Sequence, residues 1–185
     1  ETSGRIAFRF EGEDGEKISY TYAELNRRVC QCANALRSIG LGQGDAVGLF
    51  MPMCPDLVTV FLAVIKIGGV ILPLFSGYGP QAISTRLNDA GAKVVVTADG
   101  FNRRGRAVNM KSVLDKALLA CPTVEQVVIS HHVGAENIDW VDGRDKWWHE
   151  IVPNQSGQAE TLVTGADDVL MIIYTSGTTG RPKGA

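Results

Sequence analysis

The chain has 185 residues, of which 45% are hydrophobic and 21% are charged, and its formal net charge at pH 7 is −2. This composition is typical of a globular protein rather than a disordered one. A net charge so close to zero gives no electrostatic attraction to nucleic acid or to an anionic membrane, which argues against a general nucleic-acid binder.

Predicted strands and helices alternate from the start of the chain. Thr21 followed by Glu24 is typical of a capping box, so a short strand from residue 18 is expected to lead into a helix that runs to about Ile39 and ends at Gly40. Apolar runs and helical spacing then predict strands at 46–51, 70–74, 93–97 and 124–130, and helices at 56–67, 80–90 and 112–120. This alternation predicts an α/β fold with a mostly parallel sheet and helices on both faces.

One apolar stretch is long enough to imitate a membrane span. Residues 57–75 are almost all apolar, but Lys66, the Gly68-Gly69 pair and Pro73 divide them into a helix, a turn and a strand. We therefore expect no membrane span here.

The alternation fades between residues 134 and 165. A short helix is expected at 145–151, with three tryptophans pinning an otherwise polar loop to the core, and residues 153–157 have the composition of a linker. The four cysteines show no spacing typical of a metal site, so we expect reduced thiols in a cytoplasmic protein. No metal site is predicted at the three histidines either, and the opening residues show no signal peptide.

The chemistry of the chain is concentrated in residues 174–184, Tyr-Thr-Ser-Gly-Thr-Thr-Gly-Arg-Pro-Lys-Gly. An apolar run at 169–174 leads into them and predicts a buried strand. Glycines allow backbone N–H groups to approach an anion, hydroxyls add donors, Pro182 stiffens the turn and Lys183 supplies a positive charge. The stretch predicts a cradle for a polyphosphate, and the alternative is a flexible loop that closes a hairpin.

Two other nucleotide-binding classes lack their motifs. A P-loop counted from Gly177 needs Gly at position 182 and Ser or Thr at 184, where this chain has Pro182 and Gly184. A dinucleotide oxidoreductase needs a Gly-x-Gly-x-x-Gly motif after its first strand, and residues 48–56 contain Gly48 alone.

The motif at 174–184 closely resembles the phosphate-binding signature of the adenylate-forming enzymes, which include acyl-CoA synthetases, peptide-synthetase adenylation domains and firefly-type luciferases. The resemblance implies binding of the ATP β- and γ-phosphates, bridged by Mg²⁺, while a carboxylate attacks the α-phosphate. The residues that it assigns to the ATP phosphates are Thr175, Ser176, Gly177, Thr178, Thr179, Gly180 and Lys183, and Lys183 is also assigned a catalytic role.

The resemblance extends in order over nearly the whole chain. Residues 19–25 and 65–74 resemble the first two motifs of the family, and residues 44–49 match one of its strand entries. Residues 97–106 and 141–149 resemble segments of acetyl- and propionyl-CoA synthetases in particular.

In that branch the arginine-rich turn contacts the nucleotide phosphates of CoA. The resemblance therefore assigns Arg103, Arg104, Gly105 and Arg106 to a CoA phosphate, and Phe75–Gly79 to the path of the pantetheine or the adenine. From the residues alone, a solvated basic turn is the other interpretation of 103–106.

Taken together, the resemblance implies that residues 1–185 are the N-terminal segment of the large, AMP-binding domain of an adenylate-forming enzyme. The implied function is that of an acyl-CoA synthetase, which uses ATP, Mg²⁺ and CoA to activate a short- or medium-chain carboxylic acid. A non-catalytic phosphate- or CoA-binding fragment, a peptide-synthetase domain and a luciferase-like enzyme remain as alternatives. Because the family's acyl pocket and C-terminal domain are expected beyond Ala185, we expect the isolated chain to be inactive.

Overall fold

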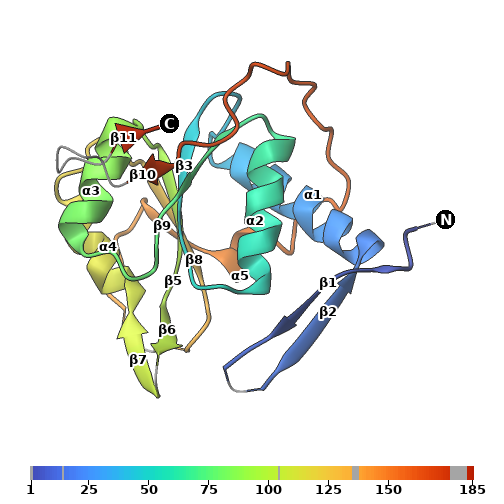
Figure 1. Cartoon of the computed structure of the whole chain (residues 1–185), viewed down its shortest axis with the longest axis horizontal. Helices are drawn as coiled ribbons and strands as arrows, with labels where there is room; N and C mark the ends of the chain where they lie inside the picture. The colour runs from blue at the N-terminus through green and yellow to red at the C-terminus, as the bar shows by residue number, and fades with distance from the viewer. Residues whose placement is uncertain (1, 14, 104, 135–137, 176–182) are drawn as a thin grey trace.

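A sheet of five parallel strands runs through the middle of the molecule (Figure 1). The computed structural model describes residues 2–13, 15–103, 105–134, 138–175 and 183–185. In spatial order the strands are β4 (Val70–Pro73), β3 (Ala46–Phe50), β5 (Val94–Ala98), β8 (Gln126–Ser130) and β9 (Asp145–Trp147). The prediction of a mostly parallel sheet is confirmed.

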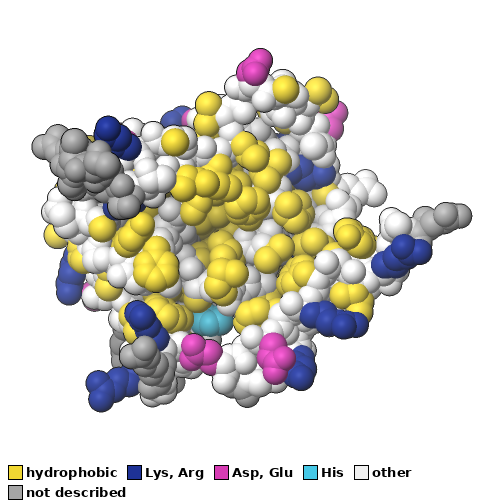
Figure 2. Space-filling model, in the orientation of Figure 1, with side chains coloured by type: hydrophobic (Ala, Val, Ile, Leu, Met, Phe, Trp, Pro, Cys, Tyr) yellow, Lys and Arg dark blue, Asp and Glu magenta, His cyan; other side chains and the backbone are white. Residues whose placement is uncertain are grey.

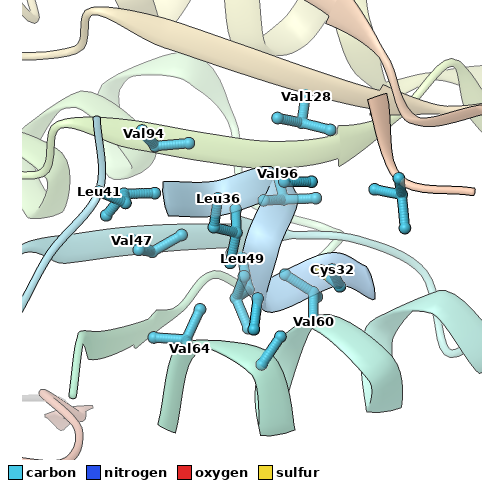
Figure 3. Close-up of a cluster of buried hydrophobic side chains, with 14 of the residues drawn as sticks. Cys32, Leu36, Leu41, Val47, Leu49, Val60, Val64, Val94, Val96 and Val128 are labelled. Carbon is cyan, nitrogen blue, oxygen red and sulfur yellow. The ribbon is translucent and has the colours of Figure 1, made fainter. Parts of the chain in front are cut away.

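Helices cover both faces of this sheet, as the alternating pattern predicts. One face carries α1 (Tyr22–Ser38), α2 (Pro55–Lys66) and the short α5 (Trp148–Ile151), and the other carries α3 (Pro80–Asp89) and α4 (Met110–Leu118). Figure 3 shows the first layer, in which Cys32 and Leu36 of α1 meet Val60 and Val64 of α2 over the valines of the sheet.

Every residue of β3 is buried, because its alternate side chains enter opposite layers. Val47 and Leu49 belong to the layer of α1 and α2, whereas Phe50 belongs to the layer of α3 and α4. At Gly48 a Cβ atom would lie 2.8 Å from Leu87 Cδ2 of α3. Glycine at this point therefore lets Leu87 of the helix pack directly against the strand.

The predicted capping box at the start of α1 is confirmed. Thr21 Oγ1 accepts a hydrogen bond from the Glu24 N–H (3.2 Å), and Glu24 Oε2 accepts one from the Thr21 N–H (2.8 Å). The helix ends at Ser38, and Gly40 follows with a φ of 92°. The Gly68-Gly69 pair is also explained, since a Cβ at Gly69 would lie 3.0 Å from Val64 Cγ1.

Three antiparallel hairpins complete the described strands. They are formed by β1 (Ile6–Glu11) with β2 (Lys17–Thr21), by β6 (Gly100–Arg103) with β7 (Arg106–Asn109), and by β10 (Tyr174–Thr175) with β11 (Lys183–Gly184). The sequence predicted only β2 among these strands. The strands β10 and β11 have two residues each and β6 and β7 have four each, whereas β1 was missed although Ile6, Phe8 and Phe10 alternate along it. Among the described residues, no helix is long and apolar enough to cross a membrane.

The prediction of a buried strand at 169–174 is wrong. Only Met171 pairs with the sheet there, in an isolated parallel bridge to Ile71 at the outer edge of β4. Val169, Leu170 and Ile173 are 62%, 50% and 52% exposed. Figure 2 shows hydrophobic side chains gathered over the middle of this face, between α2 and the β10–β11 hairpin. Apolar content thus indicated a strand, but the segment lies at an edge where its side chains are not covered.

Two other predictions need correction. The helix expected at 145–151 starts only at Trp148, because residues 145–147 pair with β8 as strand β9. The linker-like residues 153–157 are bound to α1, where Gln31 Nε2 donates to the Pro153 carbonyl (2.8 Å) and Asn34 Nδ2 donates to the Ser156 carbonyl (3.0 Å). Side chains of a neighbouring helix thus supply hydrogen bonds to the backbone carbonyls of this segment, which has no regular secondary structure.

A buried ion network joins α4 to the first residue of β9 and to the segment that precedes it. The Nζ of the fully buried Lys111 lies 2.9 Å from Asp145 Oδ2 and 2.7 Å from Asp115 Oδ2, and it donates to the Asp139 carbonyl (2.7 Å). Arg144 Nε lies 2.6 Å from Asp145 Oδ1, and Arg144 Nη2 lies 2.6 Å from Asp115 Oδ1. Two cations therefore face two carboxylates, and each buried charge is compensated.

We expect Lys111→Met to destabilise the protein strongly, because it leaves the buried carboxylate of Asp145 without its ammonium partner. The free energy of unfolding should fall by about 3–5 kcal/mol, measured by urea denaturation at pH 7. Lys116→Met is the control on the same helix, because Lys116 is exposed and its loss should change the free energy of unfolding by at most about 0.5 kcal/mol. Equal effects of the two substitutions would contradict this account.

The same network makes stability depend on pH in acid. Burial by itself raises the pKa of Asp145, but hydrogen bonds from Arg144 and Lys111 outweigh it, so the pKa lies below the ordinary aspartate value. The stabilisation is therefore complete above the unfolded pKa of about 3.9 and is lost as the pH falls through the folded value. We expect the free energy of unfolding to fall more steeply below about pH 5 in the wild type than in Asp145→Asn. Parallel pH profiles would exclude Asp145 as the source.

Candidate functional site

The strand order places a crevice at the carboxyl edge of the sheet. The chain leaves β3 for β4 on one side and then crosses to β5 on the other, and ligands of open α/β sheets bind at such a reversal of order. A cleft of about 550 Å³ lies at this edge. It is lined by the segment 52–56 after β3, by Ser76 after β4, by Phe101 and Asn102 of β6, and by the β1–β2 hairpin.

Two carboxylates, the buried Asp99 and the partly buried Asp56, hold the loops around this cleft. Asp99 is fully buried after β5, and its Oδ1 accepts the N–H groups of Gly100 (2.7 Å), His132 (2.9 Å) and Val133 (3.1 Å). Asp56 Oδ2 accepts the hydroxyl of Ser130 at 2.6 Å. These contacts fix the start of α2 and the exit of β8 relative to β5, so the shape of the cleft is set by the sheet.

The charge of the cleft does not suit a phosphate. Its described lining contains Glu11, Glu13, Glu16 and Asp56, with no lysine or arginine. His131 and His132 also line it, and His131 stacks on Trp147 with ring centroids 4.1 Å apart, while Trp140 stacks on Trp147 at 5.2 Å. The cleft is thus acidic with an aromatic rim, and cationic groups for an anionic ligand must come from outside it.

The arginine-rich turn predicted to contact CoA is the tip of the β6–β7 hairpin. Arg103 and Arg106 are partners across the hairpin, both are exposed, and Gly105 has a φ of 74°. Figure 2 shows Lys and Arg side chains at this end of the molecule. Arg104 lies outside the described residues. Two guanidinium groups on facing residues of a hairpin are suited to binding one phosphate.

The structure describes only the two ends of the motif at 174–184. Thr175 and Lys183 are paired across the β10–β11 hairpin, and both are exposed. Reciprocal hydrogen bonds between the backbones of Ile173 and Ala185, at 2.9 and 3.0 Å, extend this pairing. The predicted residues Ser176, Gly177, Thr178, Thr179 and Gly180 lie outside the described residues.

Tyr174 connects this hairpin to α3. Its hydroxyl donates to Asp89 Oδ2, and its ring centroid lies 5.3 Å from Arg86 Cζ. Burial and the hydrogen bond to Asp89 raise the pKa of Tyr174 to about 12, so the hydroxyl remains a donor at neutral pH. Sequence reasoning assigned no role to Arg86 or Asp89, because each has the ordinary appearance of a polar residue on an amphipathic helix.

The described members of the two predicted sets, Thr175 and Lys183 in one and Arg103, Gly105 and Arg106 in the other, do not come together. Asp89, the anchor of β10, is the last residue of α3 and precedes β5, whereas the β6–β7 hairpin follows the carboxyl end of β5. Figure 1 accordingly shows the two hairpins at opposite ends of the sheet. In the segment 75–79, Tyr78 packs close to Arg86, while Phe75 is 62% exposed.

The chain is similar to proteins that are named as acetyl- or acyl-CoA synthetases. An acetyl-coenzyme A synthetase of Streptomyces coelicolor is 43% identical over 180 residues, which are 97% of this chain and 28% of that enzyme. One from Chromobacterium violaceum is 44% identical over 184 residues, which are 98% of this chain and 28% of that enzyme. The crystal structure of a Brucella canis acyl-CoA synthetase matches with a TM-score of 0.79 and 27% identity, over 98% of this chain and 30% of that one.

The chain thus spans less than a third of the length of these relatives. The sheet and its two helical layers correspond to part of an acyl-CoA synthetase fold. The model of the AMP-binding enzyme family matches residues 1–185 without remainder. On that match, the chain belongs to the AMP-binding enzyme family.

Proposed function

We propose that residues 1–185 are the N-terminal segment of the AMP-binding domain of a cytoplasmic acyl-CoA synthetase, called here the parent protein. Such an enzyme activates a carboxylic acid with ATP and transfers the acyl group to CoA. The observation that carries this proposal is the identity of 43–44% to acetyl-coenzyme A synthetases over almost the whole chain. The four free, buried cysteines are in keeping with a reducing compartment.

The ATP phosphates are assigned to the motif that begins at β10. Lys183 pairs with Thr175 across the hairpin, and an ammonium group on a flexible stem can follow a phosphate as its charge changes. Residues 176–180 would add backbone N–H groups and hydroxyls as further donors. Mg²⁺ would neutralise the phosphate charge when bound with ATP. Fixed donors and cations of this kind stabilise the charge that develops as pyrophosphate leaves.

The phosphate of CoA is assigned to the tip of the β6–β7 hairpin. Arg103 and Arg106 supply two guanidinium groups from facing positions, and Arg104 and Gly105 complete the turn. Guanidinium groups bind phosphate oxygens through paired, charge-assisted hydrogen bonds. The two anion sites need not adjoin, because the nucleotide phosphate and the reactive thiol of CoA lie at opposite ends of a long molecule.

The substrate acid is expected to be short, because the relatives with the stated identities are named for acetate. A medium-chain acid remains the alternative. A chain that binds phosphate or CoA without catalysis, a peptide-synthetase domain and a luciferase-like enzyme are the other candidates, and they differ from the proposal in whether CoA thioesters are formed.

The function is tested by assaying thioester formation by the parent protein with ATP, Mg²⁺, CoA and a panel of acids from two to ten carbons. We expect the highest kcat/KM with acetate or propionate. The isolated 185-residue chain should support no acid-dependent exchange between pyrophosphate and ATP. Adenylate formation without thioester would favour a peptide-synthetase domain, and the absence of both products with every acid would reject the proposal.

Lys183→Ala in the parent protein tests the assignment of the phosphate site. We expect kcat/KM for ATP to fall by about 10- to 100-fold, because a cation that stabilises the developing charge is lost. The melting temperature should stay unchanged, since Lys183 is exposed. Lys17→Ala, which removes an exposed lysine from β2, is the matched control. Unchanged kinetics in Lys183→Ala would remove this lysine from the site.

A further inference from the structure

Arg86 lies between two tyrosine rings that come from distant parts of the chain. Its Cζ atom is 4.3 Å from the ring centroid of Tyr78 and 5.3 Å from that of Tyr174. The residue is only 8% exposed, and its Nη1 donates to the Ala82 carbonyl (2.7 Å). A planar guanidinium group can stack on aromatic rings on both sides, which an ammonium group cannot do.

Asp89 completes the arrangement three residues later on the same helix. Positions i and i+3 share one face of a helix, so the carboxylate of Asp89 and the guanidinium of Arg86 both reach the side chain of Tyr174. The carboxylate accepts the Tyr174 hydroxyl, while the guanidinium contacts its ring. Tyr174 is thus held at two points by one turn of α3.

Packing alone does not require an arginine at this position. Among the described residues, Arg86 Nε is buried without a hydrogen-bond partner, which costs free energy that an apolar side chain would not incur. Tyr78 and Tyr174 are each partly buried against the core layer of α3 and α4, which an aliphatic residue could also support. The guanidinium group supplies what an aliphatic side chain does not, which is a planar cationic contact to both rings.

The two tyrosines belong to the two segments to which ligand contacts have been assigned. Tyr174 opens β10, whose next residue pairs with Lys183, and Tyr78 lies in the segment 75–79 on the expected path of CoA or adenine. Phe75 extends the contact, with its ring edge-on to Tyr78 at 5.7 Å. A displacement of Arg86 would therefore shift both segments relative to α3.

We propose that Arg86 and Asp89 are positioning residues, which fix the β10–β11 hairpin and with it Lys183 against the segment 75–79. They touch no reacting atom and act through Tyr174 and Tyr78. The kinetic part of this proposal rests on the proposed function, whereas the anchoring of the hairpin does not.

Hydrogen exchange of the 185-residue chain tests the anchoring directly. Tyr174→Phe removes the hydroxyl bound to Asp89 and keeps the ring, and Arg86→Lys keeps the charge and removes the planar group. Both should accelerate exchange of the Ile173 amide, which pairs with Ala185, by about tenfold, while the amides of β3 stay protected. Tyr22→Phe, at an exposed tyrosine of α1, is the control for hydroxyl loss and should leave the rate unchanged. An Ile173 amide that exchanges at the wild-type rate in both Tyr174→Phe and Arg86→Lys would overturn the proposal.

The parent protein then shows whether the anchoring serves the site. In pyrophosphate–ATP exchange, Tyr174→Phe should raise KM for ATP by about three- to tenfold, because the competent position of the hairpin is less populated. KM for the acid and the melting temperature should stay within about twofold and about 2 °C of the wild type. Accelerated amide exchange with an unchanged KM for ATP would show that Arg86 and Asp89 make only a structural contact with Tyr174, and it would overturn their positioning role. If the wild-type parent protein shows no pyrophosphate–ATP exchange with any acid, the proposed function fails. The hydrogen-exchange result alone then decides whether Arg86 and Asp89 anchor the hairpin.

Discussion

The structure depends on the burial of a parallel sheet on both of its faces. Alternate side chains of β3 enter different core layers. A shift of register by one residue would therefore place each side chain in the wrong layer, facing helices against which it does not pack. Gly48 sets the closest approach of α3 to the sheet. The strands therefore act as a fixed frame, and everything at their carboxyl edge takes its position from the point at which each strand ends.

At that edge the loops after β5 and β8 are held by a buried charge, because Asp99 accepts three backbone N–H groups. At the start of β9, Asp145 is compensated by Lys111 and Arg144. Burying a carboxylate without such partners would cost several kcal/mol of folding free energy or more. Each of these carboxylates therefore favours the one local backbone arrangement that supplies its partners. Of the carboxylates that line the cleft, Asp56 is engaged in such a contact, because it accepts the hydroxyl of Ser130.

The sequence revealed those features whose signals are local. Thr21 and Glu24 mark a helix start, and the apolar runs of β3 and β5 mark buried strands, because each pattern is complete within a few residues. The run at 169–174 misled because apolarity does not say which strand a segment pairs with. Here only Met171 pairs with the central sheet, while Tyr174 pairs with β11. The link between Arg86 and Tyr174 spans 88 positions and leaves no periodic trace, so only the fold could bring it to light.

The distribution of charge bears on how phosphate-bearing ligands are held. The cleft is acidic, whereas Lys183, Arg103 and Arg106 are exposed on two hairpins at opposite ends of the sheet. An ion pair at 4 Å is worth about 1 kcal/mol in bulk water and several times more where water is excluded. Cations on open hairpins therefore bind a phosphate weakly until a second surface covers them. The contacts proposed for this chain would be strengthened by any further surface of the parent protein that excluded water from the hairpins.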